Sequence, residues 1–238
     1  MSRTRRSFMQ QSLAAALTAG GAATAVAAKK KKSIQPPPKV ELPPPVSGKP
    51  WLEAGELISK MNWLNPPAEV NFSAGTVTVK SKPRTDFWRK TFYGYVTDNG
   101  HLFSVPVFGD FLFQARVNGK YAALYDQAGL MVRLDEQHWM KCGTELFENK
   151  RWASVVFTHD FSDWSTMEDL SQSEAVYWRV ARKKDSIEAQ CSKDGQNFLT
   201  IRQGYFPPFA EVQVGIMCAA PEGGGFEASF DELRLEKP

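Results

Sequence analysis

From residue 69 onward, apolar and polar residues alternate in short runs that are separated by turn residues. A period of two is typical of a β-strand with one buried face, because successive side chains point to opposite faces. Eleven such runs are predicted as strands: 70–72, 76–80, 111–117, 129–134, 139–145, 152–159, 175–182, 187–191, 198–202, 212–218 and 226–235. Only residues 52–61 have the spacing of a short amphipathic helix. This number of short strands predicts an all-β sandwich of two sheets.

Residues that tolerate a positive φ separate several of these runs. Asn118-Gly119, Asp194-Gly195 and Asp98-Asn99-Gly100 are predicted as turns, because Asn, Asp and Gly adopt left-handed backbone at little cost. The polar triplet 135–137 separates the predicted strands 129–134 and 139–145, and we expect these two strands to form an antiparallel hairpin.

Pairing around the 135–137 turn places residues of the two strands opposite each other. The predicted pairs are Arg133 with Trp139, Met131 with Lys141, Gly129 with Gly143, and Gln127 with Glu145. Since side chains alternate, all eight point to one face. The opposite face carries an apolar set suited to a core: Ala128, Leu130, Val132, Met140 and Cys142. Glycines inside strands often mark the close approach of a ligand.

The polar face of this hairpin has two interpretations: a solvated lattice of charge pairs, or a binding groove. An exposed Trp beside spaced charges favours the groove. A planar ring stacks on the apolar face of a sugar, while charged and amide groups bond its hydroxyls. The predicted ligand-binding residues are Gln127, Arg133, Trp139, Lys141 and Glu145, with Asp163 and Trp164 of a 162–165 loop at the rim. The other tryptophans expected in the core are Trp63, Trp88, Trp152 and Trp178.

Residues 1–27 have the three parts of an export signal. Arg5-Arg6 followed by Phe8 resembles the twin-arginine signal, a weakly apolar stretch follows, and Ala25-Val26-Ala27 supplies a cleavage site. The alternative is a membrane anchor, but this stretch is short and weakly apolar for a membrane span. We therefore expect a periplasmic or secreted protein with no integral membrane segment after signal removal.

Residues 28–50 hold seven of the fifteen prolines, including 36–38 and 43–45. Such a segment favours extended polyproline II and is predicted to be a semi-rigid linker. A ligand for a proline-binding module is the alternative. Residues 51–238 are then expected to form the folded domain.

The net charge of +3 hides an uneven distribution. Residues 1–50 hold nine basic residues and one acidic residue, so 20 basic and 25 acidic residues remain from Trp51 onward. A body with an excess of acidic residues lacks the basic surface that nucleic-acid-binding proteins carry. Nucleic acid is therefore not an expected partner.

No cofactor or metal site is predicted. The chain has no G-x-G-x-x-G, Walker, H-E-x-x-H or G-x-S-x-G motif. Its three cysteines and three histidines are far apart in sequence: Cys142, Cys191 and Cys218, and His101, His138 and His159. Each cysteine lies in a predicted strand, where we expect a small buried hydrophobic residue, and an odd count permits one disulfide at most.

Six motifs appear in order along the body. They are Thr85-Asp86-Phe87-Trp88-Arg89, Tyr93-Gly94 with Asp98-Asn99-Gly100-His101, the run from Tyr125 to Met131, Trp139-x-Lys141-x-Gly143-x-Glu145, Ser162-Asp163-Trp164-Ser165, and Ser192-x-Asp194-Gly195. Together they resemble the DUF1349 family, which includes regulation-of-enolase proteins, over roughly residues 61–235. The resemblance implies a concanavalin A-like jelly roll of two antiparallel sheets. Relatives of this domain also occur beside glycosidase catalytic domains, which implies a link to carbohydrate.

Three functions are compatible with these observations. The first, which we expect, is a non-catalytic, lectin-like domain that binds a glycan on its polar sheet face. The second is a hydrolase or lyase acting on glycans with a carboxylate pair from Asp126, Glu145 and Asp163. The E-x-D-x-E strand of jelly-roll glucanases is missing, however. The third is a protein-interaction or regulatory domain, which would present a flat apolar patch in place of a polar groove.

Overall fold

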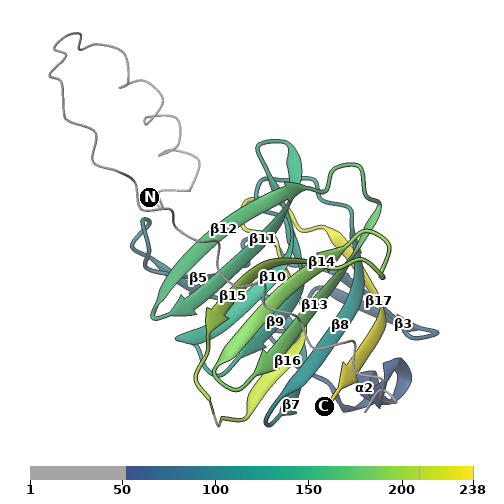
Figure 1. Ribbon diagram of the computed structural model, residues 1–238. Helices are drawn as coiled ribbons and strands as arrows, with labels where there is room; N and C mark the ends of the chain where they lie inside the picture. The colour runs from purple at the N-terminus through teal and green to yellow at the C-terminus, as the bar shows by residue number, and fades with distance from the viewer. Residues whose placement is uncertain (1–51, 209, 238) are drawn as a thin grey trace, which may run out of the picture. The chain divides into compact units, whose positions relative to one another are not determined.

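Two antiparallel β-sheets account for most of the described chain in the computed structural model (Figure 1). The structure describes residues 52–208 and 210–237. The predicted export signal (1–27) and linker (28–50) lie outside the described residues. The all-β sandwich that the alternating pattern predicts is confirmed.

The eight-stranded sheet, called sheet 1, has the order β15-β14-β13-β8-β17-β4-β3, and β1 pairs with β17. Its strands are β1 (Leu52–Glu53), β3 (Glu69–Ser73), β4 (Thr76–Lys80), β8 (Phe111–Gly119), β13 (Ala175–Lys183), β14 (Ser186–Ser192), β15 (Leu199–Tyr205) and β17 (Glu227–Glu236). The single helix among the described residues, α2 (Ala54–Lys60), follows β1 and buries Leu57.

The seven-stranded sheet, called sheet 2, has the order β12-β11-β10-β9-β16-β7-β2. Its strands are β2 (Asn62–Leu64), β7 (His101–Val107), β9 (Gln127–Arg133), β10 (His138–Phe147), β11 (Lys150–His159), β12 (Phe161–Asp169) and β16 (Val212–Ala219). Strands that are far apart in sequence pair in both sheets, β8 with β17 and β9 with β16. These non-local pairs close the jelly roll.

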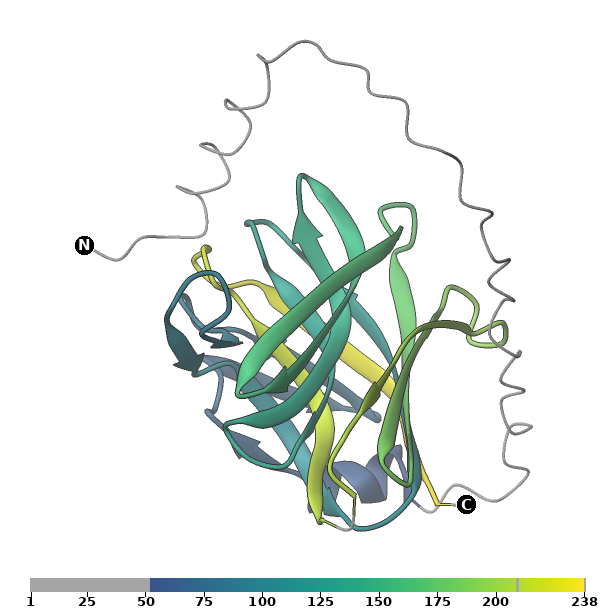
Figure 2. The ribbon, with the colours of Figure 1, turned by 60° about the vertical axis from the view of Figure 1, so that its left-hand side comes forward.

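The inward-facing residues of the two sheets form one apolar core. Leu130 and Ile216 from sheet 2, and Phe113 and Trp178 from sheet 1, are fully buried in the same cluster. Burial of a Leu, Ile or Phe side chain contributes about 1.5–3 kcal/mol each. Figure 2 shows the two sheets as separate layers. The residues between these core positions point to the outer face of each sheet.

A two-stranded hairpin, β5 (Phe87–Arg89) with β6 (Val96–Asp98), packs on the outer face of sheet 2. Phe87 and Trp88 of β5 form a second apolar cluster there with Met131, Trp139 and Val156 of sheet 2. The sequence analysis did not predict these strands. Three residues are too short to show a period, and all three residues of β5 are buried.

All eleven predicted strands are present, with ends shifted by a few residues, and the predicted helix spans Ala54–Lys60. Two predictions are wrong: residues 162–165 belong to β12 and form no loop, and Asn118-Gly119 ends β8 without turning. β12 pairs along its length with β11, so this pairing overrides the low strand propensity of Ser and Asp. β7 was also missed, because Pro106 interrupts its pattern; Pro106 lies opposite Gln213 of β16 and beyond the residues that pair with β2.

Candidate functional site

The β9–β10 hairpin has the register that the sequence predicts. The structure pairs Arg133 with Trp139, Met131 with Lys141, Gly129 with Gly143, and Gln127 with Glu145. Neighbouring strands extend the same face with Gln213, Gly215 and Met217 of β16, Ser154, Val156 and Thr158 of β11, and Ser162 and Trp164 of β12. We call this surface the outer face of sheet 2.

This face is covered, whereas the sequence analysis expected it to be open. The exposed fractions of Trp139, Lys141 and Glu145 are 1%, 5% and 4%. The β5–β6 hairpin lies over Trp139, whose ring centroid is 6.1 Å from that of Phe87. Its indole Nε1 donates to the carbonyl oxygen of Glu136 at 3.2 Å. Trp139 is therefore buried in the second apolar cluster and has no open ring face.

Lys141 holds the hairpin through its ammonium group. Its Nζ donates to Asp86 Oδ1 at 3.1 Å and to the carbonyl oxygen of Phe87 at 2.8 Å. The amide of Gln127 also donates to Asp86 Oδ1, at 3.4 Å. The side chains of Lys141 and Asp86 are both nearly fully buried, at 6% and 5% exposure. Removing one partner of such a pair would leave an uncompensated buried charge.

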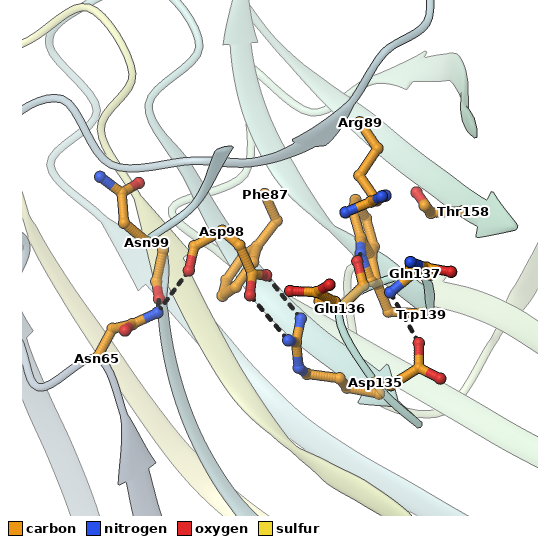
Figure 3. Close-up of polar contacts among 12 residues, drawn as sticks. Asn65, Phe87, Arg89, Asp98, Asn99, Asp135, Glu136, Gln137, Trp139 and Thr158 are labelled. Atoms are coloured by element: carbon orange, nitrogen blue, oxygen red, sulfur yellow. Dashed lines mark hydrogen bonds and ion pairs between the residues drawn. The ribbon is translucent and has the colours of Figure 1, made fainter. Parts of the chain in front are cut away.

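Arg133 forms a second attachment for the hairpin. Its Nη1 and Nη2 donate to Oδ1 and Oδ2 of Asp98 at 2.7 and 2.8 Å. Figure 3 shows these bonds at Asp98, with the rings of Phe87 and Trp139 nearby. Asn65 Nδ2 also donates to the carbonyl oxygen of Asp98, at 2.9 Å. Bidentate pairs of this type fix both distance and orientation, so Arg133 supports the hairpin that covers it.

A small recess remains in the outer face of sheet 2, and no β5 or β6 residue lines it. We call it the Gly143 pit; its lining is Gln127, Ala128, Lys141, Cys142, Gly143, Glu145, Ser154 and Met217. Its volume of about 10 Å³ admits one water molecule or one hydroxyl group. A Cβ atom on Gly143 would lie 2.3 Å from the carbonyl oxygen of Ala128. The approach of β9 to β10 therefore requires glycine here, and the missing side chain leaves the recess.

Glu145 supplies the carboxylate of the Gly143 pit. Its Oε2 accepts from Ser154 Oγ at 2.6 Å and from Trp164 Nε1 at 3.0 Å. The half-buried Trp164 meets Phe147 edge-on, with ring centroids 5.3 Å apart, and Phe147 stacks on Tyr125 at 5.7 Å. The residues that line the pit therefore include Glu145, Lys141, Gln127 and Ser154, and three aromatic rings lie beside Glu145.

The other two candidate catalytic carboxylates lie away from this face. Asp126 and Asp163 each precede or follow an outward-facing residue, so alternation directs them to the opposite side of the sheet. Asp126 Oδ2 accepts from the backbone amides of Ala122 and Ala123, and burial raises the pKa of Asp126. Asp163 is exposed and pairs with Arg202 at 2.8 Å. Glu145 is thus the one member of the trio at the pit.

Three polar residues of the site were missed by the sequence analysis. Asp86 and Asp98 come from the hairpin, whose position over the sheet depends on contacts between distant segments. Both residues lie in motifs that carry the family resemblance, and their presence in these motifs could have identified them as site residues. Ser154 is the cross-strand partner of Gly143, so it could have been found by extending the register to β11.

The described residues contain no group of three or more His, Cys, Asp or Glu side chains that could hold a metal ion. Cys142, Cys191 and Cys218 are buried free thiols. Burial raises the pKa of Cys218 to about 12, which disfavours the reactive thiolate. Within residues 52–208 and 210–237, no helix is long and apolar enough to cross a membrane.

Sheet 1 carries a polar hollow of about 560 Å³, adjacent to one of about 230 Å³, and both include Arg116 and Glu174 in their lining. Arg116 makes a bidentate ion pair with Asp231, and this pairing raises the pKa of Arg116. Asp194 caps the β14–β15 turn through the amides of Gln196 and Asn197, which lower its pKa. Much of the charge at this hollow therefore stabilises local structure.

Comparison with known proteins agrees with this architecture. The sequence profile of DUF1349, described as a protein of unknown function, matches residues 63–238. A Saccharomyces cerevisiae protein named regulation of enolase protein 1 is 40% identical over 181 residues, which cover 76% of this chain and 91% of the yeast protein.

Solved structures resemble the same region. A crystal structure of a functionally unknown protein from Saccharomyces cerevisiae has 40% identity and a TM-score of 0.73, covering 76% of this chain and 98% of that chain. A xylan β-1,4-xylosidase from Bacillus halodurans has 13% identity and a TM-score of 0.53, covering 69% of this chain and 33% of that chain. Lectin I-B4 from Griffonia simplicifolia has 10% identity and a TM-score of 0.50, covering 75% and 93%. The last two comparisons show a common β-sandwich fold.

Proposed function

This chain belongs to the DUF1349 family, and from that premise we propose that it is an exported, non-catalytic carbohydrate-binding domain. The observation that carries the proposal is the Gly143 pit, a hydroxyl-sized recess whose lining residues include Gln127, Lys141, Glu145 and Ser154, with three aromatic rings beside Glu145. The β-sandwich fold, which lectins and glycosidase-associated domains share, is compatible with this function.

The chemistry of the pit suits a sugar hydroxyl. Such a group can donate to the carboxylate of Glu145 or to the amide oxygen of Gln127, and both residues line the pit. Trp164, half-buried and bonded to Glu145, supplies an aromatic edge for the sugar ring.

The positions of the carboxylates favour binding over hydrolysis. Glycosidases need two carboxyl groups that are ~5–5.5 Å apart in retaining enzymes and ~6.5–9.5 Å apart in inverting ones. Asp126 is engaged by backbone amides and Asp163 by Arg202, both on the other side of the sheet. Asp86 is engaged by Lys141. Each of these three carboxylates is engaged in a local contact, which supports binding at Glu145 over hydrolysis by a carboxylate pair.

A glycan array probed with the full chain tests the proposal. We expect binding to at least one glycan, weakened about tenfold or more in Glu145→Gln, because a hydrogen bond to a charged group is worth about 1.5–3 kcal/mol. Glu222→Gln, at an exposed position, is the matched control. Thermal unfolding of both variants separates lost binding from lost structure. Absence of binding to every glycan, or unchanged binding in a folded Glu145→Gln protein, would refute the proposal.

A further inference from the structure

Two arginines lie close together on the outer face of sheet 1, on the opposite side of the sandwich from the Gly143 pit. Arg179 of β13 pairs with Gln114 of β8, and Gln114 pairs with Arg234 of β17. Figure 1 shows these three strands as neighbours in the sheet. The residues before and after each of the three are buried in the core, so alternation directs Gln114 and both arginines outward.

Gln114 brings the two guanidinium groups side by side. Its Oε1 accepts from Nε and Nη2 of Arg179 at 3.1 and 2.7 Å, and from Nη2 of Arg234 at 3.4 Å. Gln114 is only 3% exposed, so this acceptor is held in place. Because the shared oxygen belongs to a neutral amide, it does not balance either charge. Burial and the charge of Arg234 lower the pKa of Arg179.

Glu236 balances these two charges only in part. Its Oε1 lies 3.4 Å from Nε of Arg234, yet this buried Nε makes no hydrogen bond within the part of the chain that the structure describes. Among the side chains that the structure describes, no carboxylate forms an ion pair with Arg179. Two positive charges are therefore held beside a single ion pair.

Arg179 is fixed in position with part of its donor set unused. Its Cζ lies 3.5 Å from the centroid of the Phe198 ring, which covers one face of the guanidinium. The bonds to Gln114 use Nε and Nη2, which form one edge of this planar group. A guanidinium has five N–H donors, and Nη1 has no partner among residues 52–208 and 210–237. The side chain is half-buried, so this second edge is oriented and available to an added acceptor.

We propose that Arg179 and Arg234 bind an oxyanion, the carboxylate or sulfate group of a small ligand, on the outer face of sheet 1. Guanidinium groups form short and often bidentate hydrogen bonds with such anions. A bound anion supplies the acceptor that the second edge of Arg179 lacks, and its charge offsets the repulsion between the two guanidinium groups. This site is separate from the Gly143 pit and goes beyond the proposed function.

Acidic residues around the pair favour one small anionic group over a polyanion. Asp231, Glu232 and Glu236 lie on the same strand, β17. Arg116 engages Asp231 and Glu232 at 2.7 and 3.5 Å, so it does not extend the positive surface. A nucleic acid needs a continuous basic surface and would meet these carboxylates. A single carboxylate or sulfate group needs only the two guanidinium groups.

Titration of the full chain with sodium sulfate and, separately, with sodium acetate tests the proposal and distinguishes the two kinds of oxyanion. Neither probe carries a hydroxyl group for the Gly143 pit, and sodium chloride keeps the ionic strength constant. Nuclear magnetic resonance would follow the Nε–H signals of the arginines. We expect at least one anion to bind saturably, about tenfold or more weakly in Arg179→Gln and in Arg234→Gln. Arg179→Lys keeps the charge but not the planar fork, so it should recover only part of the affinity.

Lys183→Gln is the matched control, because Lys183 is an exposed cation on the same face of β13 as Arg179. It should leave the affinity for the anion unchanged. Thermal unfolding without added anion identifies the variants that fold, and three arginine variants at two positions are available. If neither anion binds saturably, or if the folded arginine variants bind as tightly as the unmodified chain, the proposal is wrong. The proposed function is unaffected by that outcome, since the glycan array tests the other sheet.

Discussion

Gly129 and Gly143 face each other across β9 and β10, and neither position has room for a methyl group. A Cβ on Gly129 would lie 2.0 Å from the carbonyl oxygen of Cys142, and one on Gly143 would lie 2.8 Å from the Cα of Gly129. Glycine in a strand marks a close approach, and here the approaching group is the neighbouring backbone. At the residue scale, the pit is thus a consequence of strand packing.

Gly143→Ala should destabilise the protein, because the added methyl group meets backbone atoms that cannot rotate away. Overpacking of this kind costs about 1–3 kcal/mol, which chemical denaturation would measure. Gly55→Ala is the control, since nothing lies within 4 Å of its added Cβ and alanine favours the helix that contains it. Equal stabilities of the two variants would contradict this account of the glycine pair.

His101 makes the stability of the fold sensitive to acid. Burial lowers the pKa of His101 below its ordinary value of 6.5. Its Nε2 accepts from the amide of Lys82 at 2.9 Å while its Nδ1 bonds the carbonyl oxygen of Asn65 at 2.6 Å, so the neutral ring fits both partners. The unfolded chain therefore binds a proton more readily than the folded one as the pH falls below about 6.5.

We expect the free energy of unfolding to be greatest above pH 6.5 with respect to this group, and to decrease as the pH falls from 6.5 through the lower folded-state pKa. Urea denaturation between pH 5 and pH 8 would show the slope. His101→Gln removes the titrating ring, so the slope should become smaller in that variant. An unchanged slope would show that His101 does not contribute.

At the scale of elements, the β5–β6 hairpin is the feature that separates this sandwich from a simple pair of sheets. Its two strands are short, and two attachments position them: Lys141 to Asp86 and Phe87, and Arg133 to Asp98. The residues predicted to bind ligand thus include two that support the hairpin.

Lys141→Met should destabilise the protein by about 3–5 kcal/mol, because it leaves the carboxylate of Asp86 buried without its cation. The double variant Asp86→Asn/Lys141→Met removes both charges and should recover part of this loss. Hydrogen exchange would show faster exchange at residues 86–100 in the single variant. If the double variant is as unstable as the single one, the ion pair is not the cause.

Trp139→Ala tests the second apolar cluster. Because Trp139 is 1% exposed and packs on Phe87, its truncation should leave a cavity and cost about 3–5 kcal/mol. Thermal and chemical unfolding would measure the loss. Phe72→Ala, at an aromatic side chain that is 51% exposed, should cost much less. If Trp139→Ala were as stable as the unmodified protein, the packing of the β5–β6 hairpin on Trp139 would not contribute to stability.

At the scale of the whole molecule, we propose that the predicted twin-arginine leader exports the sandwich in its folded state. The twin-arginine pathway carries folded cargo, and the three cysteines of the sandwich are free and buried, so folding before export requires no disulfide. Expression with the native leader in a bacterial host should yield a periplasmic or secreted protein whose N-terminal sequencing starts within a few residues of Ala28. Replacing Arg5 and Arg6 with Lys should block its export. An intact Met1 in the membrane fraction would contradict cleavage.

The sequence predicted those parts of the site that follow from the pairing of adjacent strands. The alternation of Gln127, Met131 and Arg133 against Trp139, Lys141 and Glu145 determined one shared face, and that register is confirmed. Trp164 joins this face, but Asp163 does not, because residues 162–165 continue a strand. Successive side chains of a strand point to opposite faces. Because the segment was predicted as a loop, the sequence analysis placed Asp163 and Trp164 together at the rim of the site.

The sequence by itself determined the fold class, eleven of the strands in the described residues and the register of the β9–β10 hairpin, because a period of two and turn chemistry are local properties of the chain. Only the tertiary structure decided that the polar face is covered. The covering residues Phe87 and Asp98 lie some forty residues before the strands they meet, and no local pattern encodes which segment packs on an outward face. Exposure is a property of contacts between distant segments, so the predicted open groove is instead a buried, ion-paired interface beside the Gly143 pit.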